Sequence, residues 1–294
     1  MRSLIQFMEQ YVTENALDTL EGGHQTAIKG VWFYHSRHGN KLQPFTYQSG
    51  IITLAQGNKT IHVGGEPIEY GPNDYLVMGV PMPLQCEAKT VEGKPLMGLT
   101  IDIDHGILHR QVRMLQSLGY QPPRPSSKST YRFCSVKMSI EMQDICRRIM
   151  QALCHPYEAH LLGESLLEEV VFQALMSEQG YVLFDLAQYD NHYVRIAKAL
   201  EKMHADFGSP MSVERLAKEA SMSPSAFHQA FRNVTLETPI QYIKKVRLNK
   251  ARELIQFQGM RVNEAARKVG YNSTSQFSRE YKRHFNQTPK SVTP

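Results

Sequence analysis

The last third of the chain contains an internal repeat, and this repeat restricts the possible folds more than any other feature of the sequence. Val213, Ala217, Ala220 and Met222 recur 49 residues later as Val262, Ala266, Val269 and Tyr271. Phe227, Phe231, Arg232, Thr238 and Pro239 recur 50 residues later as Phe277, Tyr281, Lys282, Thr288 and Pro289. The repeat predicts two helix-turn-helix units, the second with a turn one residue longer.

One long helix is predicted between the two copies, over residues 239–257. Its apolar residues recur at helical spacing, at Tyr242, Ile243, Val246, Leu248, Ala251, Leu254 and Ile255. A continuous helix in this place would hold the two units at a fixed separation.

The first hundred residues follow a different pattern, in which short apolar runs alternate with turn residues. The runs lie at 31–34, 50–56, 59–63, 67–70, 74–80 and 96–103. Hairpin turns are expected at 56–59 and 63–66. Six or more short strands at this spacing favour an antiparallel sandwich or barrel. Helices are expected at 105–118, 140–153 and 161–177, with a loop at 121–129.

A chain of 294 residues is long enough for two domains. We therefore predict an α+β protein with three parts. Residues 1–180 form an antiparallel β-barrel with its following helices, residues 181–191 form a linker, and residues 192–294 form an all-α domain with two helix-turn-helix motifs.

Charge is divided unevenly along the chain. Residues 191–294 hold 18 Lys and Arg against 8 Asp and Glu, a net charge of +10, whereas the preceding residues carry −5. Basic domains bind nucleic acids because Lys and Arg displace counterions from the phosphates. A solvated basic surface is the alternative, and charge alone does not decide between them.

The repeat also carries a family resemblance. The matching residues are Thr238-Pro239, Tyr242, Arg247-Leu248, Ala251-Arg252, Leu254, Ala265-Ala266, Val269-Gly270-Tyr271, Ser273, Phe277-Ser278-Arg279, Phe285 and Thr288-Pro289. They resemble the DNA-binding domain of AraC/XylS-type bacterial transcription regulators over about the last hundred residues. The resemblance implies that both recognition helices of one monomer enter successive major grooves of duplex DNA, about 34 Å apart.

A weaker resemblance lies upstream. It rests on Leu54-Ala55-Gln56-Gly57, Lys59, Tyr70-Gly71-Pro72, Asp74-Tyr75-Leu76-Val77, Pro83, Gly98-Leu99, Asp102 and Asp104. These residues are similar to the cupin-like N-terminal sensor of one branch of the same family. The resemblance implies a sequence-specific transcription regulator, modulated by a small-molecule effector in its N-terminal domain.

Helix geometry selects the residues that can reach DNA. On the second helix of each helix-turn-helix unit, these residues lie opposite the apolar residues that anchor the helix. They are Ser225, His228, Gln229, Arg232, Thr274, Ser275, Ser278, Arg279 and Lys282. Arg279 suits guanine and Gln229 suits adenine, whereas Lys282 lies where a DNA backbone would pass. Two of them have an alternative: Arg279 could hold a carboxylate or cap a helix, and His228 could be merely solvated.

An enzyme is the competing class. Metal-dependent cupins resemble one another through an HxH pair with a following Glu and a later His, but His35 and His38 lie three residues apart, on opposite faces of a strand. A DNA-repair protein fused to a similar helical domain would carry a reactive cysteine cluster, which the spacing of the four cysteines does not offer. We therefore expect no catalytic residues, no metal and no cofactor.

Two aromatic residues of one strand face, Trp32 and Tyr34, are candidate liners of an effector cavity; as an alternative, they are ordinary core residues. Cys86 could sense an electrophile, although buried thiols usually only pack. Reduced thiols and the absence of a signal peptide or membrane span predict a cytoplasmic protein.

The final expectation concerns assembly. Leu162, Leu166, Val170 and Gln173 form a stripe at helical spacing, which we assign to a homodimer, with the subunit's own core as the alternative. RNA polymerase is left open as a further partner, and no membrane contact is expected.

Overall fold

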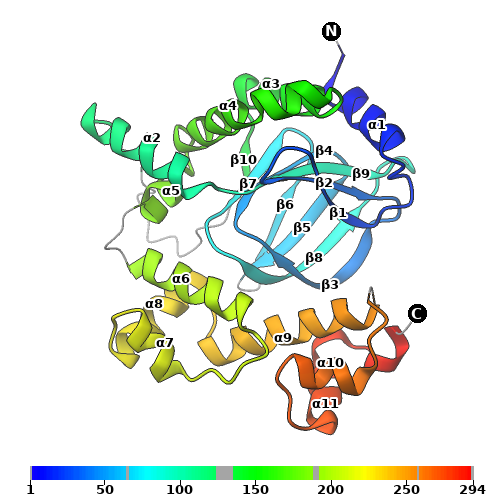
Figure 1. Ribbon diagram of the computed structural model, residues 1–294, viewed down its shortest axis with the longest axis vertical. Coiled ribbons are helices and arrows are strands. Elements are labelled where there is room, and N and C mark those ends of the chain that lie inside the picture. Colours follow the sequence, from blue (N-terminus) through cyan, green and yellow to red (C-terminus); the bar gives the residue numbers. More distant parts are fainter. Residues whose placement is uncertain (1, 64–65, 124–134, 188–191, 257, 293–294) are drawn as a thin grey trace. The chain divides into compact units, whose positions relative to one another are not determined.

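A computed structural model describes residues 2–63, 66–123, 135–187, 192–256 and 258–292 (Figure 1). The chain divides into two compact units. The first contains Met1–Leu42, Gln48–Gly79 and Cys86–Tyr189, and the second contains Gln43–Tyr47, Val80–Gln85 and Asp190–Pro294. None of the helices in the described ranges is both long and apolar enough to cross a membrane.

The described strands confirm the predicted antiparallel β-domain, and they form two sheets, the sandwich alternative, without closing into one barrel. One sheet has the order β1-β2-β9-β4-β7-β10 and the other β3-β8-β5-β6. Their bounds are β1 (Gly22–Gln25), β2 (Val31–Ser36), β3 (Asn40–Tyr47), β4 (Gly50–Gln56), β5 (Asn58–Val63), β6 (Glu66–Tyr70), β7 (Asp74–Met78), β8 (Met82–Lys89), β9 (Leu96–Ile101) and β10 (Ser135–Lys137).

The two predicted hairpin turns have different outcomes. Strands β5 and β6 pair in antiparallel register from Val63 opposite Glu66, as expected, although residues 64 and 65 lie outside the described ranges. The turn at 56–59 is not a hairpin, because β4 and β5 belong to different sheets. Gly57, with φ of 85°, takes the chain from one sheet to the other, in a backbone region that favours glycine.

Five helices accompany the sheets of the first unit (Figure 1): α1 (Leu4–Glu14), α2 (His105–Ser117), α3 (Ile140–Leu153), α4 (Pro156–Leu175) and α5 (Gly180–Ala187). The predicted linker at 181–191 overlaps α5, and its residues 188–191 lie outside the described ranges. The predicted loop at 121–129 also lies outside them from residue 124 onward.

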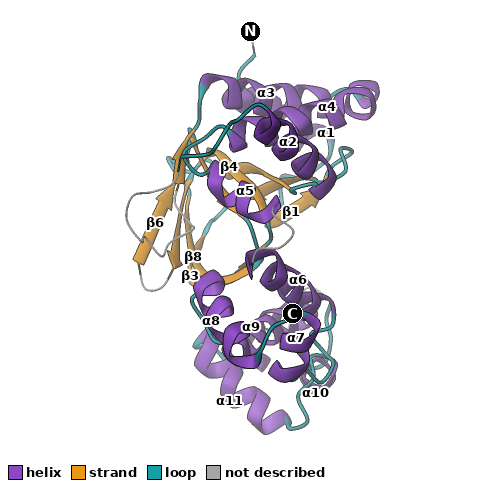
Figure 2. Ribbon diagram, turned by 90° about the vertical axis from the view of Figure 1, so that its left-hand side faces the viewer, coloured by secondary structure: helices purple, strands orange, loops and turns teal. Residues whose placement is uncertain are grey.

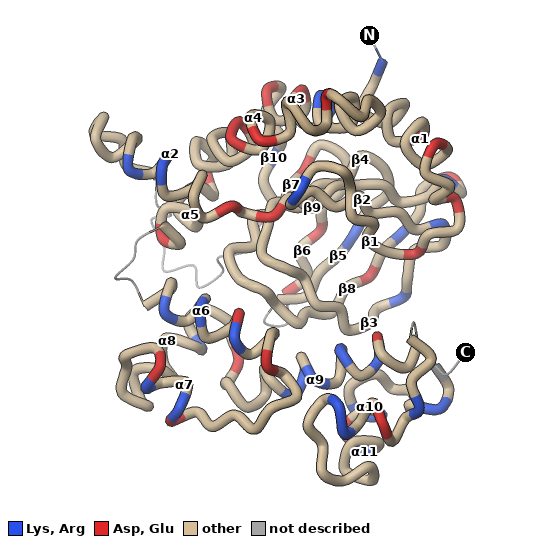
Figure 3. The backbone as a smooth tube through the Cα atoms, in the orientation of Figure 1, with Lys and Arg blue, Asp and Glu red and all other residues tan. Residues whose placement is uncertain are grey.

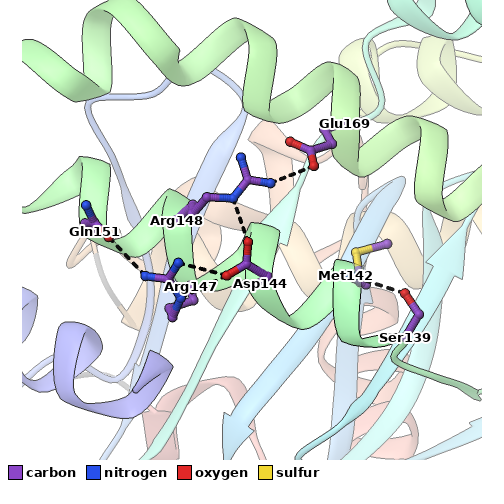
Figure 4. A network of polar contacts seen from close by, with 7 residues as sticks. All are labelled: Ser139, Met142, Asp144, Arg147, Arg148, Gln151 and Glu169. Carbon is purple, nitrogen blue, oxygen red and sulfur yellow. Dashed lines mark hydrogen bonds and ion pairs between the residues drawn. The ribbon is translucent and has the colours of Figure 1, made fainter. Parts of the chain in front are cut away.

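A polar network joins α3 to α4 (Figure 4). Arg148 donates to Asp144 Oδ2 at 2.9 Å and to Glu169 Oε1 at 2.6 Å, so one guanidinium links both helices. Arg147 donates to the other Asp144 oxygen at 2.8 Å. Because the Arg148 side chain is 35% exposed, water screens these pairs, and each contributes on the order of 1 kcal/mol or less.

Two of the four residues of the apolar stripe that we assigned to a dimer belong to the core of the first unit. Leu166 is 5% exposed and Val170 is fully buried on α4. Leu162 of the same stripe is 48% exposed, and Tyr157, Leu161 and Phe172 of α4 also face solvent. Periodicity identified an apolar helix face correctly, but it did not show which partner covers that face.

The second unit contains the helices α6 (His192–Ala205), α7 (Val213–Glu219), α8 (Pro224–Thr235), α9 (Pro239–Gln256), α10 (Val262–Lys268) and α11 (Thr274–Phe285), followed by a short 3₁₀ turn (Pro289–Val292). No strand separates these helices within the described ranges (Figure 2). The prediction from the repeat is confirmed: there are two helix-turn-helix pairs, α7–α8 and α10–α11, with the long helix α9 between them.

The backbone repeats as well as the sequence. The connection between α10 and α11 is one residue longer than that between α7 and α8, as predicted. Ser221 and Gly270, 49 residues apart, both have positive φ, of 53° and 87°. Leu236 and Asn286, 50 residues apart, both end their helices in the left-handed region. The two copies therefore share their turn and their C-terminal cap.

Candidate nucleic-acid interface

Each second helix of a pair is anchored by a buried aromatic face. On α8, Phe227 and Phe231 are fully buried, with ring centroids 5.6 Å apart. On α11, Phe277 and Tyr281 are fully buried, with centroids 5.5 Å apart, and Phe285 continues the row. Because aromatic residues three and four apart share one helix face, the opposite face of each helix is left to solvent.

The sequence-predicted site residues lie on those opposite faces. On α8, Ser225, Gln229 and Arg232 are exposed and His228 is half-buried. On α11, Thr274, Ser275, Arg279 and Lys282 are exposed and Ser278 is half-buried. The fold thus gathers the predicted residues into two polar faces, one on α8 and one on α11.

Arg279 is available for an external partner. Within the described part of the chain it forms no ion pair, so neither of its alternative roles has a partner there. The neighbouring Glu280 is held elsewhere: it accepts hydrogen bonds from Tyr271 Oη at 2.8 Å, Gln276 Nε2 at 3.2 Å and Lys244 Nζ at 3.3 Å. Burial raises the pKa of Glu280, but these donors outweigh it and leave the pKa below its usual value. The carboxylate therefore stays ionised without using Arg279.

Basic residues are frequent along α6 to α11 (Figure 3), but those of α9 are already occupied. Lys244 pairs with Glu280, Lys245 with Glu237, and Lys250 with Glu253 at 2.6 Å. Arg247 donates to the carbonyls of Phe207 and Ser209 at 2.8 Å each. The Arg252 guanidinium lies 5.0 Å from the centroid of the Phe285 ring. These cations therefore hold the unit together.

Sequence reasoning missed one polar neighbour on α8. Gln229 Nε2 donates to Asn233 Oδ1 at 3.1 Å, and Asn233 is exposed. The spacing of four residues could have revealed this pair, because such residues are neighbours on a helix surface. Gln229 and Asn233 form one amide pair on the exposed face of α8.

In the first unit, Trp32 and Tyr34 lie on one face of β2. Trp32 is 37% exposed and donates from Nε1 to Asp102 Oδ2 at 3.1 Å. Tyr34 is half-buried, and the amino group of the buried Lys59 lies 3.5 Å from the centre of its ring. Cys86 is buried on β8. Among the residues that the structure describes, no three His, Cys, Asp or Glu side chains converge in a way that could hold a metal ion.

Comparisons with known proteins agree with this geometry. A family profile described as the AraC-type transcriptional regulator N-terminus matches residues 27–182, and a helix-turn-helix domain profile matches residues 216–293. AlkR of Acinetobacter baylyi, an HTH-type transcriptional regulator, is 38% identical over 95 residues, which are 32% of this chain and 31% of AlkR. The uncharacterized HTH-type transcriptional regulator YdeC of Bacillus subtilis is 22% identical over 244 residues, 82% of each chain.

Among solved structures, ToxT of Vibrio cholerae aligns with a TM-score of 0.58 at 12% identity, over 89% of this chain and 96% of ToxT. At this identity the likeness concerns the fold. The N-terminal family profile spans more than half of the chain, and the helix-turn-helix profile matches a later segment, from residue 216 to residue 293. The chain therefore belongs to the AraC-type transcriptional regulators.

Proposed function

We propose that this protein is a one-component regulator that binds specific promoter sequences through α8 and α11. The observation that carries the proposal is the repeated pair of helices, each with a buried aromatic face and an exposed polar face. Two non-identical polar faces suit the reading of two different half-sites better than sequence-blind packaging of DNA.

The residues that contact bases and those that contact the DNA backbone lie at different positions on the two helices. Arg279 presents a guanidinium, which matches the O6 and N7 acceptors of guanine in a bidentate way. Lys282 lies further along α11 and serves as a phosphate contact, as does Arg232 on α8. The side-chain amides of Gln229 and Asn233 act as a pair: one contacts adenine, and the other holds the contacting amide in place through their hydrogen bond. Ser225, His228, Thr274, Ser275 and Ser278 complete the two surfaces.

The first unit acts as the effector domain of the regulator. ToxT has been crystallised with an unsaturated fatty acid bound, which supports a small-molecule effector for a chain of this fold. Trp32 and Tyr34 belong to this domain and remain candidate effector contacts. Effector binding controls DNA affinity only if the effector binds one conformation of the chain better than another.

The regulator works as a homodimer in the cytoplasm, where promoter DNA and RNA polymerase are found. The exposed apolar residues Tyr157, Leu161 and Phe172 of α4 support an interface at this helix. Sedimentation of the full chain at micromolar concentration should give a dimer, and Leu161→Glu should give a folded monomer. A wild-type chain that sediments as a monomer would remove this part of the proposal.

Sequencing of the genomic DNA that is bound to the chain in living cells tests the main proposal. We expect discrete binding sites upstream of genes, together with DNA affinity that falls steeply as the salt concentration rises. Even coverage of the genome would reject a sequence-specific regulator. Enrichment that survives unchanged in a chain lacking residues 192–294 would reject α8 and α11 as the interface.

A further inference from the structure

The first unit contains a groove that neither Trp32 nor Tyr34 lines. Its volume is about 500 Å³, which lies within the range of small-molecule sites. Helix α1 and the turn after it supply one wall, and the end of β2 and the turn before β9 supply the other. The buried residues Val12, His35 and Met97 belong to its lining.

The two walls carry opposite charges. Glu9 and Asp18 belong to the α1 wall, and Arg37 and Lys94 belong to the sheet wall. All four side chains are exposed. Throughout the described ranges, none of the four forms an ion pair, either with another of them or with any other residue. Two carboxylates and two cations thus share one groove without neutralising one another.

The remaining polar groups of the groove are oriented by the protein. His35 Nδ1 lies 2.8 Å from the carbonyl oxygen of Leu20, and a carbonyl can only accept, so Nδ1 carries the proton. In the neutral ring, Nε2 is then a hydrogen-bond acceptor. Gln56 donates from Nε2 to the Pro95 carbonyl at 2.7 Å, which leaves Oε1 as a second acceptor. Both acceptors lie on the sheet side of the groove and can accept an N–H or O–H group of a ligand.

We propose that this groove binds a small zwitterion of the α-amino acid class. The ammonium group of the ligand faces the carboxylates of Glu9 and Asp18, and its carboxylate faces Arg37 and Lys94. A molecule with both charges can satisfy both walls at once, whereas a long-chain acid would leave Glu9 and Asp18 facing an apolar tail. The assignment of this ligand as the effector rests on the proposed function.

Calorimetric titration of the full chain with each of the twenty common amino acids tests the site. At least one should bind and should raise the melting temperature by an amount that grows with the logarithm of its concentration above the Kd. The matching amine without the carboxylate, and the matching acid without the amino group, should each bind at least tenfold more weakly. Absence of binding by all twenty, or equal binding of the singly charged compounds, would overturn the proposal.

Matched variants locate the binding. Arg37→Gln and Glu9→Gln should each lower the affinity for the amino acid by tenfold or more, because the two changes remove one charge from each wall of the groove. Lys41→Gln and Glu69→Gln, which are exposed residues outside the groove, should leave the affinity unchanged. Equal affinities in all four variants would place the ligand elsewhere and overturn the groove. Binding without any change in DNA affinity would support the groove but reject its ligand as the effector of the proposed regulator.

Discussion

Replacement of Arg279 by alanine isolates the contribution of one base-reading side chain. Arg279 is exposed and forms no ion pair in the described part of the chain, so its truncation should change folding stability by no more than about 0.5 kcal/mol. A bidentate contact with guanine contributes about 1 to 3 kcal/mol of base discrimination. Arg279→Ala should therefore weaken the preferred site by about 5- to 150-fold, since each 1.36 kcal/mol is a tenfold change.

Fluorescence anisotropy with the preferred duplex and with duplexes changed at single positions measures this loss. In Arg279→Ala, one base position should lose its preference while the salt dependence stays the same, because no phosphate contact is lost. Lys282→Ala should weaken all duplexes about equally and reduce the salt slope by about 0.9. Arg267→Ala, an exposed cation on α10, serves as the control for overall charge. If Arg279→Ala and Arg267→Ala had the same effect on every duplex, Arg279 would not be a base reader.

Three further predictions concern stability and ligand binding. Leu166→Ala should lower the free energy of unfolding by about 2 to 5 kcal/mol in urea titrations, whereas Leu161→Ala should change it by less than about 0.5 kcal/mol. If Leu161→Ala were the more destabilising change, Leu166 would belong to an interface and not to the core. Burial lowers the pKa of His204 and of His284 to about 4, so the unfolded chain binds more protons below pH 6.5. Stability should therefore be full above about pH 7 and fall by about 2 kcal/mol per histidine between pH 7 and pH 5, and a flat profile would contradict the burial of both rings. Arg37→Gln should abolish the rise in melting temperature that a bound amino acid causes, and an unchanged rise would exclude Arg37 from the groove.

The helical domain was predictable because its information is local and is given twice. The spacing of Phe227 and Phe231 fixes one helix face, and its recurrence at Phe277 and Tyr281 removes the ambiguity of a single apolar run. The extra residue in the second turn was visible as a change in the repeat offset. The predicted DNA-facing residues followed from the same geometry, because a buried anchor determines which residues lie opposite.

The sheets were less predictable because their order depends on distant pairings. Four strands, β1, β3, β8 and β10, were absent from the apolar runs. Among them, β3 contains Pro44, and β8 alternates buried and exposed residues around Gln85. No local signal shows that β4 and β5 belong to different sheets. The division into two sheets instead of one barrel is therefore a property of the whole domain.

The groups that pack against each helix face, or pair with its charges, could be identified only from the structure. The stripe of Leu166 and Val170 looks the same in sequence whether it packs inside the subunit or against a second copy. Lys244 of α9 pairs with Glu280, 36 residues away in the sequence, and no local pattern indicates that pair. The charged groove was likewise not foreseen, because its residues come from α1, β2 and the turn before β9.

Selection of binding sites from random duplexes by the purified full chain tests the central claim most directly. If α8 and α11 read successive major grooves, the selected sequences should share two short conserved blocks with centres about 10 to 10.5 base pairs apart. Arg279→Ala should remove the preference at one position of one block and leave the other block intact. A selected pool with no shared sequence, or with a single block that neither α8 nor α11 variants alter, would contradict the account.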